Sequence, residues 1–202
     1  MKIGPKYKIA KRLGPTVFEK TQSQKFAIAQ ERRAKNAPRR RGASEFGKQL
    51  LEKQKVRFTY GLTEKQFANY VASAMEEHGE NPAELLHRQL EMRLDNVLYR
   101  LGLAKTRRAA RQMVSHGHVT VNGVKTTIPS RQIHLTDRIA VRKGSKGSVM
   151  FEGFAERFSE RPLPSWLSWN PKEMEGGLVE MPNMASADPA GDLASVLSFY
   201  SR

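Results

Sequence analysis

A short stretch of the sequence concentrates cationic side chains at the start of an expected helix. The run KTRRAARQMVSHG contains Lys105, Arg107, Arg108 and Arg111. Thr106 is a suitable N-cap and Gly117 a suitable end for this helix. Free backbone N–H groups and the helix dipole favour anions at a helix start, and guanidinium groups bind phosphate oxygens two at a time. The segment therefore predicts a site for a phosphate backbone.

The helical repeat separates these cations from the apolar residues of the same segment. At about 100° per residue, Arg107, Arg111 and Arg108 fall within about 100° of one another. The other side carries Ala109, Ala110, Met113 and Val114. We expect that side to pack and the first side to present three guanidinium groups. Phosphate-binding residues dominate, rather than the Asn and Gln side chains of a helix that reads DNA bases, so structured RNA fits better than DNA.

Short elements on either side of this helix complete an expected module over residues 92–147. MRLDNVLYRLGL predicts an amphipathic helix that Gly102 ends. HVTVNGVKTT predicts a β-hairpin with a type I′ turn at Asn122-Gly123, and IHLTDRIAVR predicts a further strand pair that turns at Thr136-Asp137. The module therefore reads as helix, turn, basic helix and small antiparallel sheet.

Residues 44–91 predict a helical domain. Ser44 is a suitable N-cap for a helix through Arg57, Thr63 with Gln66 forms a capping-box pattern, and Asn81-Pro82 begins a third helix. The first helix carries Lys48, Lys53, Lys55 and Arg57.

Residues 1–43 predict a basic arm with little structure of its own, because their apolar residues follow neither helical nor strand spacing for long. A short helix is expected around Gln22–Lys35. Cations that repel one another crowd around Pro38: Arg32, Arg33, Lys35, Arg39, Arg40 and Arg41. We expect the arm to become ordered on its ligand; the alternative is a disordered localisation tail.

Residues 148–202 predict a C-terminal extension that packs on the other domains. Phe151, Phe154 and Phe158 have the spacing of a short helix, and DLASVLSFYSR that of a closing helix. Between them lies a turn-rich loop with both tryptophans, which we expect to pack rather than to stack on bases.

Charge is unevenly distributed along the chain of 202 residues and net +15. Residues 1–57 are net +13 and residues 88–147 net +10, whereas residues 58–87 and 148–202 are each net −4. Two basic blocks predict a polyanionic partner. The chain has no cysteine, which excludes disulfides, thiolate metal sites and cysteine nucleophiles. No apolar run approaches the ~18 residues of a membrane span, so we expect a soluble, intracellular protein.

The run RLDNVLYRLGLAKTRRAARQMVSHGHVTVNGVKTTIPSRQI resembles the S-four (S4) RNA-binding module. FGKQLLEKQKVRFTYGLTEKQFANY before it, and SWLSWNPKEMEG and FYSR after it, resemble the flanking blocks of the bacterial small-subunit ribosomal protein S-four family. The resemblance implies an α+β fold in which the RNA-binding module is inserted beside a helical domain, behind a basic N-terminal arm.

The same resemblance implies a cytoplasmic, non-enzymatic ribosomal protein with no cofactor. It would bind a small-subunit ribosomal RNA helix junction, nucleate assembly of the subunit body and contribute to translational accuracy. Its implied partners are the neighbouring ribosomal protein S-five, facing the acidic blocks, and messenger RNA near the path by which it enters the ribosome. By position, the implied RNA contacts are Arg93, Arg100, Lys105, Arg107, Arg108 and Arg111 in the module and Lys48, Lys53, Lys55 and Arg57 in the helical block. We expect His116 and the arm cations to bind RNA as well, the latter being Arg32, Arg33, Lys35, Arg39, Arg40 and Arg41.

The sequence departs from the family in two places. Some members hold the arm with a cysteine zinc site, which this chain cannot form, so the arm must rely on RNA. The segment NAPRRRGASEFG has an arginine run in place of a glycine- and histidine-containing signature. We expect no metal site, because His116 and His118 have no acidic or thiol partners nearby in sequence.

Two other functions fit parts of the sequence. Pseudouridine synthases also carry this module, and Asp95 of the RLD run would then be a nucleophile. We expect instead that Asp95 pairs with a nearby arginine. A ribosome-associated rescue or heat-shock factor would use the module as an accessory, but the collinear flanking blocks argue against it.

Overall fold

The computed structural model describes residues 3–35, 44–152, 154, 158, 163–186 and 189–201. The chain forms two compact units, one from Met1–Leu86 with Pro189–Arg202 and one from His87–Asp188. The second unit is therefore inserted in the sequence of the first, and residues 148–202 are divided between the two. No helix within the described ranges combines the length and apolar character needed to cross a membrane.

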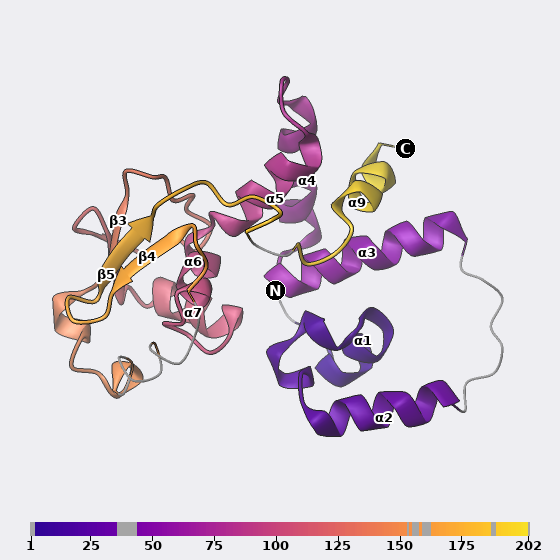
Figure 1. The fold of residues 1–202 in the computed structure, drawn as a ribbon, viewed down its shortest axis with the longest axis horizontal. Coiled ribbons are helices and arrows are strands. Elements are labelled where there is room, and N and C mark those ends of the chain that lie inside the picture. The colour runs from indigo at the N-terminus through magenta and orange to yellow at the C-terminus, as the bar shows by residue number, and fades with distance from the viewer. Residues whose placement is uncertain are drawn as a thin grey trace. The chain divides into compact units, whose positions relative to one another are not determined.

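Besides two helices near the N-terminus, the first unit contains four helices that Figure 1 labels, and the first three of them begin at the expected caps. They are α3 (Glu45–Tyr60), α4 (Glu64–Glu76), the first part of α5 (Pro82–Glu91) and α9 (Leu193–Tyr200). Ser44 Oγ accepts from Gly47 N, and Thr63 and Gln66 form a capping box. Asn81 Oδ1 accepts a hydrogen bond from the backbone N–H of Ala83 at 3.0 Å. The sequence predicts these helix starts correctly because each N-cap side chain bonds to backbone N–H groups only a few residues away.

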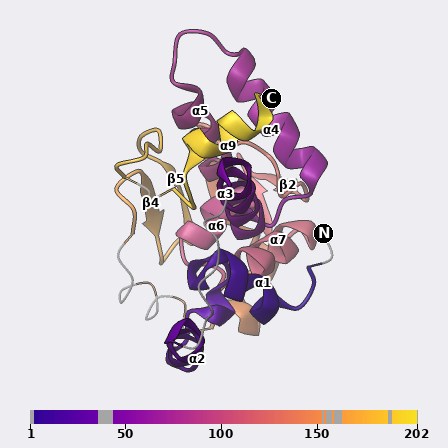
Figure 2. The ribbon, with the colours of Figure 1, turned by 90° about the vertical axis from the view of Figure 1, so that its right-hand side faces the viewer.

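The C-terminal helix α9 packs along α3, as both views show (Figures 1 and 2). Phe199 lies 5.4 Å from the Phe46 ring, and Tyr200 lies 6.1 Å from the buried Phe67 ring of α4. The closing helix expected from DLASVLSFYSR is thus confirmed, with Asp192 as its N-cap.

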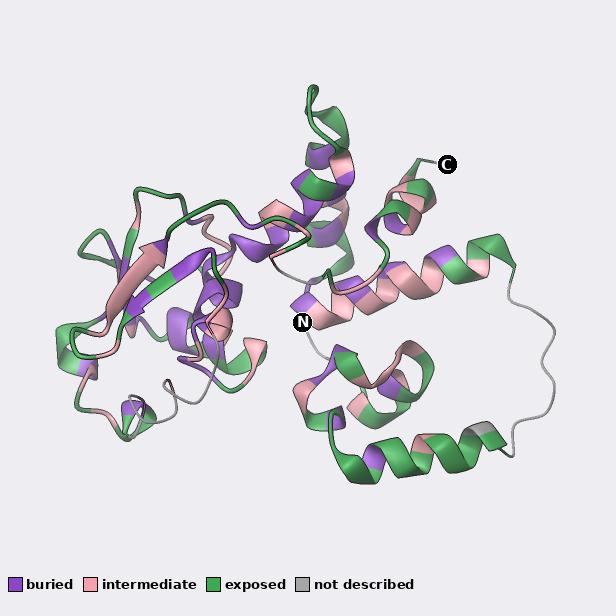
Figure 3. Ribbon diagram, in the orientation of Figure 1, coloured by how far each residue is buried: buried purple, intermediate pink, exposed green. Residues whose placement is uncertain are grey.

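The N-terminal segment has more structure than its sequence predicts. It forms α1 (Lys6–Leu13), 3-10 turns at Pro15–Val17 and Glu19–Thr21, and α2 (Gln24–Lys35). Its apolar residues make a small core of Ala10, Val17, Phe18 and Phe26. Phe58 of α3 packs against that core, so the expectation of an unstructured arm is wrong for residues 3–35. The expected helix near Gln22–Lys35 is confirmed, and most of it is exposed (Figure 3).

In the second unit, α6 (Leu94–Arg100) and α7 (Arg107–Ser115) pack against one sheet. The hairpin of β1 (Val119–Val121) and β2 (Val124–Thr126) turns at Asn122 (φ 54°) and Gly123 (φ 78°), as the type I′ prediction requires. Ser148–Phe154, described in part, adds the buried Phe151 and Phe154, while most of the helix expected through Phe158 lies outside the described residues.

The sheet is antiparallel with the order β2-β1-β3-β5-β4, and its last two strands in this order come from residues 167–178. Its remaining strands are β3 (Arg138–Val141), β4 (Leu167–Asn170) and β5 (Glu175–Leu178). The strand expected at Ile133–Leu135 is absent from this described sheet. Ile133 N instead bonds to Met92 O at 2.9 Å, and a turn closed by Asp137 follows at once.

Both tryptophans belong to this sheet rather than to a loop alone. Trp166 is completely buried just before β4, and Trp169 lies on β4, edge-on to Phe154. The expectation that they pack is confirmed, and the expectation of a loop at residues 167–170 is wrong. The sequence did not indicate that β4 pairs with β5, because β5 contains Gly176 and Gly177, and glycines weaken a strand pattern.

Candidate RNA-binding surface

The start of α7 presents two cations to solvent. Thr106 Oγ1 accepts a hydrogen bond from Ala109 N at 3.1 Å and so fixes the first turn. Lys105 and Arg108 are exposed, and in the described parts of the chain neither has a carboxylate within salt-bridge distance. Positive side chains beside the free N–H groups of a helix start make a site suited to an anion.

The neighbouring Arg107 and Arg111 turn toward α6 instead. Arg107 Nε donates to Asn96 Oδ1 at 2.8 Å, and its guanidinium stacks 4.3 Å above the Tyr99 ring. Arg111 donates to Asp95 Oδ2 through Nε at 2.8 Å and through Nη2 at 2.7 Å. Of the three guanidinium groups expected on this side of α7, that of Arg108 is exposed, whereas those of Arg107 and Arg111 are partly buried.

Asp95 is the centre of this ion-pair network. Its carboxylate also accepts from Arg93, at 3.0 Å from Nε and 2.9 Å from Nη2, and both side chains are 3% exposed. The expected pairing of Asp95 with an arginine is confirmed. The nucleophile of an RNA-modifying enzyme must be accessible to its substrate, whereas Asp95 is buried and paired with two guanidinium groups.

Glu91 is the second buried carboxylate, at 0% exposure. Its two oxygens accept from Arg100, at 2.7 Å from Nη2 and 2.8 Å from Nε. Glu91 Oε2 also accepts from Asn96 Nδ2 at 2.9 Å. A continuous chain of hydrogen bonds thus runs from Arg100 through Glu91 and Asn96 to Arg107, and it fixes the orientation of both arginines.

The expected RNA contacts of the second unit fall into three groups by exposure. Lys105, Arg108 and His116 are exposed; Arg100, Arg107 and Arg111 are partly buried; Arg93 is 2% exposed. Arg93 is buried and paired with Asp95, and its contact with RNA stays a prediction.

In the first unit, two of the four expected contacts of α3 take part in ion pairs with α4. Lys53 is buried, hydrogen-bonds Glu64 and lies 4.5 Å from the centre of the Phe199 ring. Arg57 Nε lies 3.4 Å from Glu64 Oε2. Lys48 is exposed, and Lys55 is partly buried beside Glu52. Lys48 is thus the most accessible cation of this set.

Glu64 joins three elements of the first unit. Tyr200 Oη of α9 donates to Glu64 Oε1 at 2.8 Å. Burial raises the pKa of Glu64, but hydrogen bonds from Lys53 and Tyr200 and the charges of Lys53 and Arg57 outweigh it and hold that pKa below its ordinary value. Burial and then Glu64 raise the pKa of Tyr200.

The basic end of α2 carries Arg32, Arg33 and Lys35, all exposed. Arg39, Arg40 and Arg41 lie outside the described residues. Within the described ranges, no group of three His, Asp or Glu side chains could hold a metal ion.

Sequence reasoning missed the groups that orient the arginines, namely Glu91 and Asn96. A signal was present: Glu91, Asp95 and Asn96 lie among Met92, Leu94 and Val97 at a helix start, and polar residues that share a buried segment are buried only when paired.

Two family descriptions match the chain. Residues 1–91 match the Ribosomal protein S4/S9 N-terminal domain, and residues 92–139 match the S4 domain. The chain is 44% identical over 206 residues to the small ribosomal subunit protein uS4 of Roseiflexus castenholzii, covering 99% of this chain and 98% of that protein. It is 40% identical over 206 residues to uS4 of Latilactobacillus sakei, with 98% of each covered. Over 159 residues it is 46% identical to uS4 of Mycobacterium avium, with 79% of each covered.

Proposed function

Because the chain belongs to the ribosomal protein S4 family, we propose that it is a structural, non-enzymatic constituent of the small subunit of the cytoplasmic ribosome. It binds small-subunit ribosomal RNA with exposed cations of both units. The start of α7 carries this proposal, because Lys105 and Arg108 are exposed beside a capped helix N-terminus.

The partly buried arginines support the same surface. Arg107 and Arg111 are each held by α6, and Arg111 remains 30% exposed at its side chain. A guanidinium fixed by a carboxylate loses little conformational freedom when a phosphate binds, which favours tight and shape-selective contact. Asp95 and Glu91 are in this view positioning residues for the RNA contacts.

We propose that the bound RNA element is a helix junction. Exposed cations occur on α2, on α3 and at the start of α7, so they belong to both units. A junction of helices presents several separate backbone segments, so it offers phosphates to the exposed cations of each unit. Binding of this kind would fold the junction and so nucleate assembly of the subunit body.

Salt-dependent binding tests the RNA surface. The double variant Lys105→Ala and Arg108→Ala is compared with Lys65→Ala and Lys172→Ala, which removes two exposed cations from acidic stretches. We expect the first variant to bind small-subunit ribosomal RNA more weakly. Its slope of log affinity against log salt should fall by roughly 0.7 to 0.9 per lost phosphate contact. The control should keep the wild-type slope, and equal slopes in both variants would contradict the proposal.

We propose further that the acidic blocks face proteins, among them ribosomal protein S-five, with messenger RNA near by. Glu76, Glu77, Glu80 and Glu84 are all exposed at the end of α4 and the start of α5. Clustered acidic residues repel RNA and attract a basic protein surface. Replacing Glu76, Glu77 and Glu80 by glutamine should alter misreading rates in cells and leave RNA affinity unchanged. Unaltered misreading would exclude a role of this surface in accuracy.

A further inference from the structure

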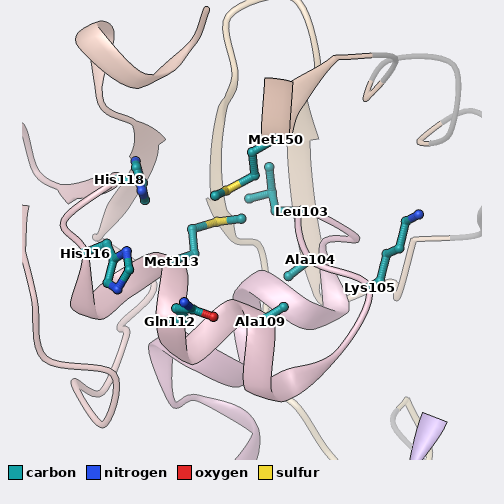
Figure 4. A pocket seen from close by; sticks show the side chains of 9 residues that line it. All are labelled: Leu103, Ala104, Lys105, Ala109, Gln112, Met113, His116, His118 and Met150. Carbon is teal, nitrogen blue, oxygen red and sulfur yellow. The ribbon is translucent and has the colours of Figure 1, made fainter. Parts of the chain in front are cut away.

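A hollow of about 340 Å³ lies beside α7, within the second unit. Its floor is apolar and consists of Leu103, Ala104 and Met113, each at most 5% exposed. Ala109 and Met150 form its walls, and in Figure 4 the Met113 and Met150 side chains lie close together above the helix. The volume is in the range of pockets that hold small organic groups, and the lining has the matching apolar character.

Polar groups surround this apolar floor. His116 and His118 lie at one end of the hollow and Lys105 at the other, with Gln112 between them on the exposed side of α7 (Figure 4). Ser145 Oγ lies 3.0 Å from His118 Nδ1, which fixes that ring. Among the described residues that line the hollow there is no carboxylate. The rim therefore suits a ligand whose edges carry hydrogen-bonding groups and which has a negatively charged group next to it.

We propose that this hollow receives one unpaired nucleobase of the RNA bound at α7, with a preference for adenine. The inference rests on the proposed RNA binding and adds to it a site for a base. A base has flat apolar faces, and thioethers make favourable contacts with the faces and edges of aromatic rings. Proteins bind unstacked RNA bases in this manner, between side chains that cover the base faces.

The surrounding charge favours a nucleotide over a protein side chain. Residues 88–147 carry net +10, and Lys105 at the rim is exposed beside Arg108. These cations complement the phosphates on either side of a flipped base, whereas an apolar side chain of a partner protein would gain nothing from them. A glutamine amide forms paired hydrogen bonds with the N6 and N7 edge of adenine, and Gln112 supplies that amide.

Two matched pairs of variants test the site on the full chain. Ala109→Phe fills the hollow, and Ser115→Phe adds the same ring at an exposed position of α7 outside it. Met150→Glu places a negative charge in its wall, and Val149→Glu places the same charge on the adjacent residue, which is 77% exposed and does not line it. Tryptophan fluorescence during urea unfolding checks that each variant is folded.

The probe is full-length small-subunit ribosomal RNA treated with dimethyl sulfate, which methylates unpaired adenines. We expect the wild type to protect at least one unpaired adenine. Ala109→Phe and Met150→Glu should lose that protection and bind about tenfold more weakly, as expected for one lost base contact. Their salt slope should stay that of the wild type. Gln112→Ala should weaken the protection of adenine and leave the salt slope unchanged.

The outcomes separate the two proposals. If the wild type binds the RNA and Ala109→Phe and Met150→Glu protect it equally well, the base site is overturned and the proposed RNA binding stands. If Ser115→Phe and Val149→Glu reduce adenine protection and RNA affinity as much as Ala109→Phe and Met150→Glu do, the hollow is not the cause of the loss. The base site is then again overturned. A wild type that does not bind ribosomal RNA overturns both.

Discussion

Asp95→Asn should destabilise the second unit strongly, although it keeps the shape of the side chain. The carboxylate accepts four N–H groups of Arg93 and Arg111 at 2.7 to 3.0 Å. An amide has one acceptor oxygen and directs N–H donors at a guanidinium that has only donors. The Arg93 side chain is 3% exposed, so water cannot replace the lost charge, whereas Arg111 is 30% exposed and is partly solvated.

Removing one partner of a buried ion pair costs about 3 to 5 kcal/mol, and the partial exposure of Arg111 places the expected loss near the lower end, about 3 kcal/mol. With a urea dependence of about 2 kcal/mol per molar, the unfolding midpoint should fall by about 1.5 M. Trp166 and Trp169 both lie in the second unit, so their fluorescence follows its unfolding.

Asp137→Asn is the matched control, because it makes the same chemical change at a partly exposed aspartate of the same unit. Asp137 accepts from Asn122 Nδ2 at 2.7 Å and from His134 N at 3.0 Å. Hydrogen bonds in contact with solvent contribute about 1 kcal/mol or less each. Because buried pairs are screened little by salt, the Asp95→Asn loss should persist at about 0.5 M salt. A midpoint change no larger than that of Asp137→Asn would refute the reasoning.

Three further changes follow from local contacts. Thr106→Ala removes the N-cap of α7 and should cost about 1 kcal/mol in urea unfolding, with weaker RNA binding. Gly176→Ala would place a Cβ 2.1 Å from Ser168 O, so it should separate β4 from β5 and shift tryptophan emission to longer wavelength; Gly144→Ala, where nothing lies within 4 Å, should not. The lowered pKa of Glu64 means that the unfolded chain takes up the proton first, near the ordinary value of 4.5. The first unit should therefore lose free energy of unfolding as pH falls from about 5 toward 3, and circular dichroism should show a smaller loss for Glu64→Gln.

The sequence predicts the elements whose signals are local. Ser44, Thr63, Asn81 and Thr106 each begin a helix where expected, because an N-cap acts on backbone groups two or three residues away. The Asn122-Gly123 turn follows for the same reason, since both residues adopt positive φ.

Contacts between distant residues could not be read in this way. β3 pairs with β5 across more than thirty intervening residues, and the sequence offered Ile133–Leu135 as a nearer partner. The helical wheel located the cations of α7 correctly but could not show that Asp95 and Asn96 of α6 face Arg111 and Arg107. The order of residues 3–35 depends likewise on a core shared with Phe58 of α3.

The interleaved course of the chain sets an order of folding during synthesis. Helix α3 packs against α9, and residues 87–188 lie between them in the sequence. A translating ribosome adds about 5 to 20 residues per second, so about 7 to 30 s separate the synthesis of Lys53 in α3 from that of Phe199 in α9. During that interval the second unit can fold as a whole, while Lys53 and Phe46 of α3 still lack their contacts with Phe199. We therefore expect the second unit to be complete before α9 completes the first unit.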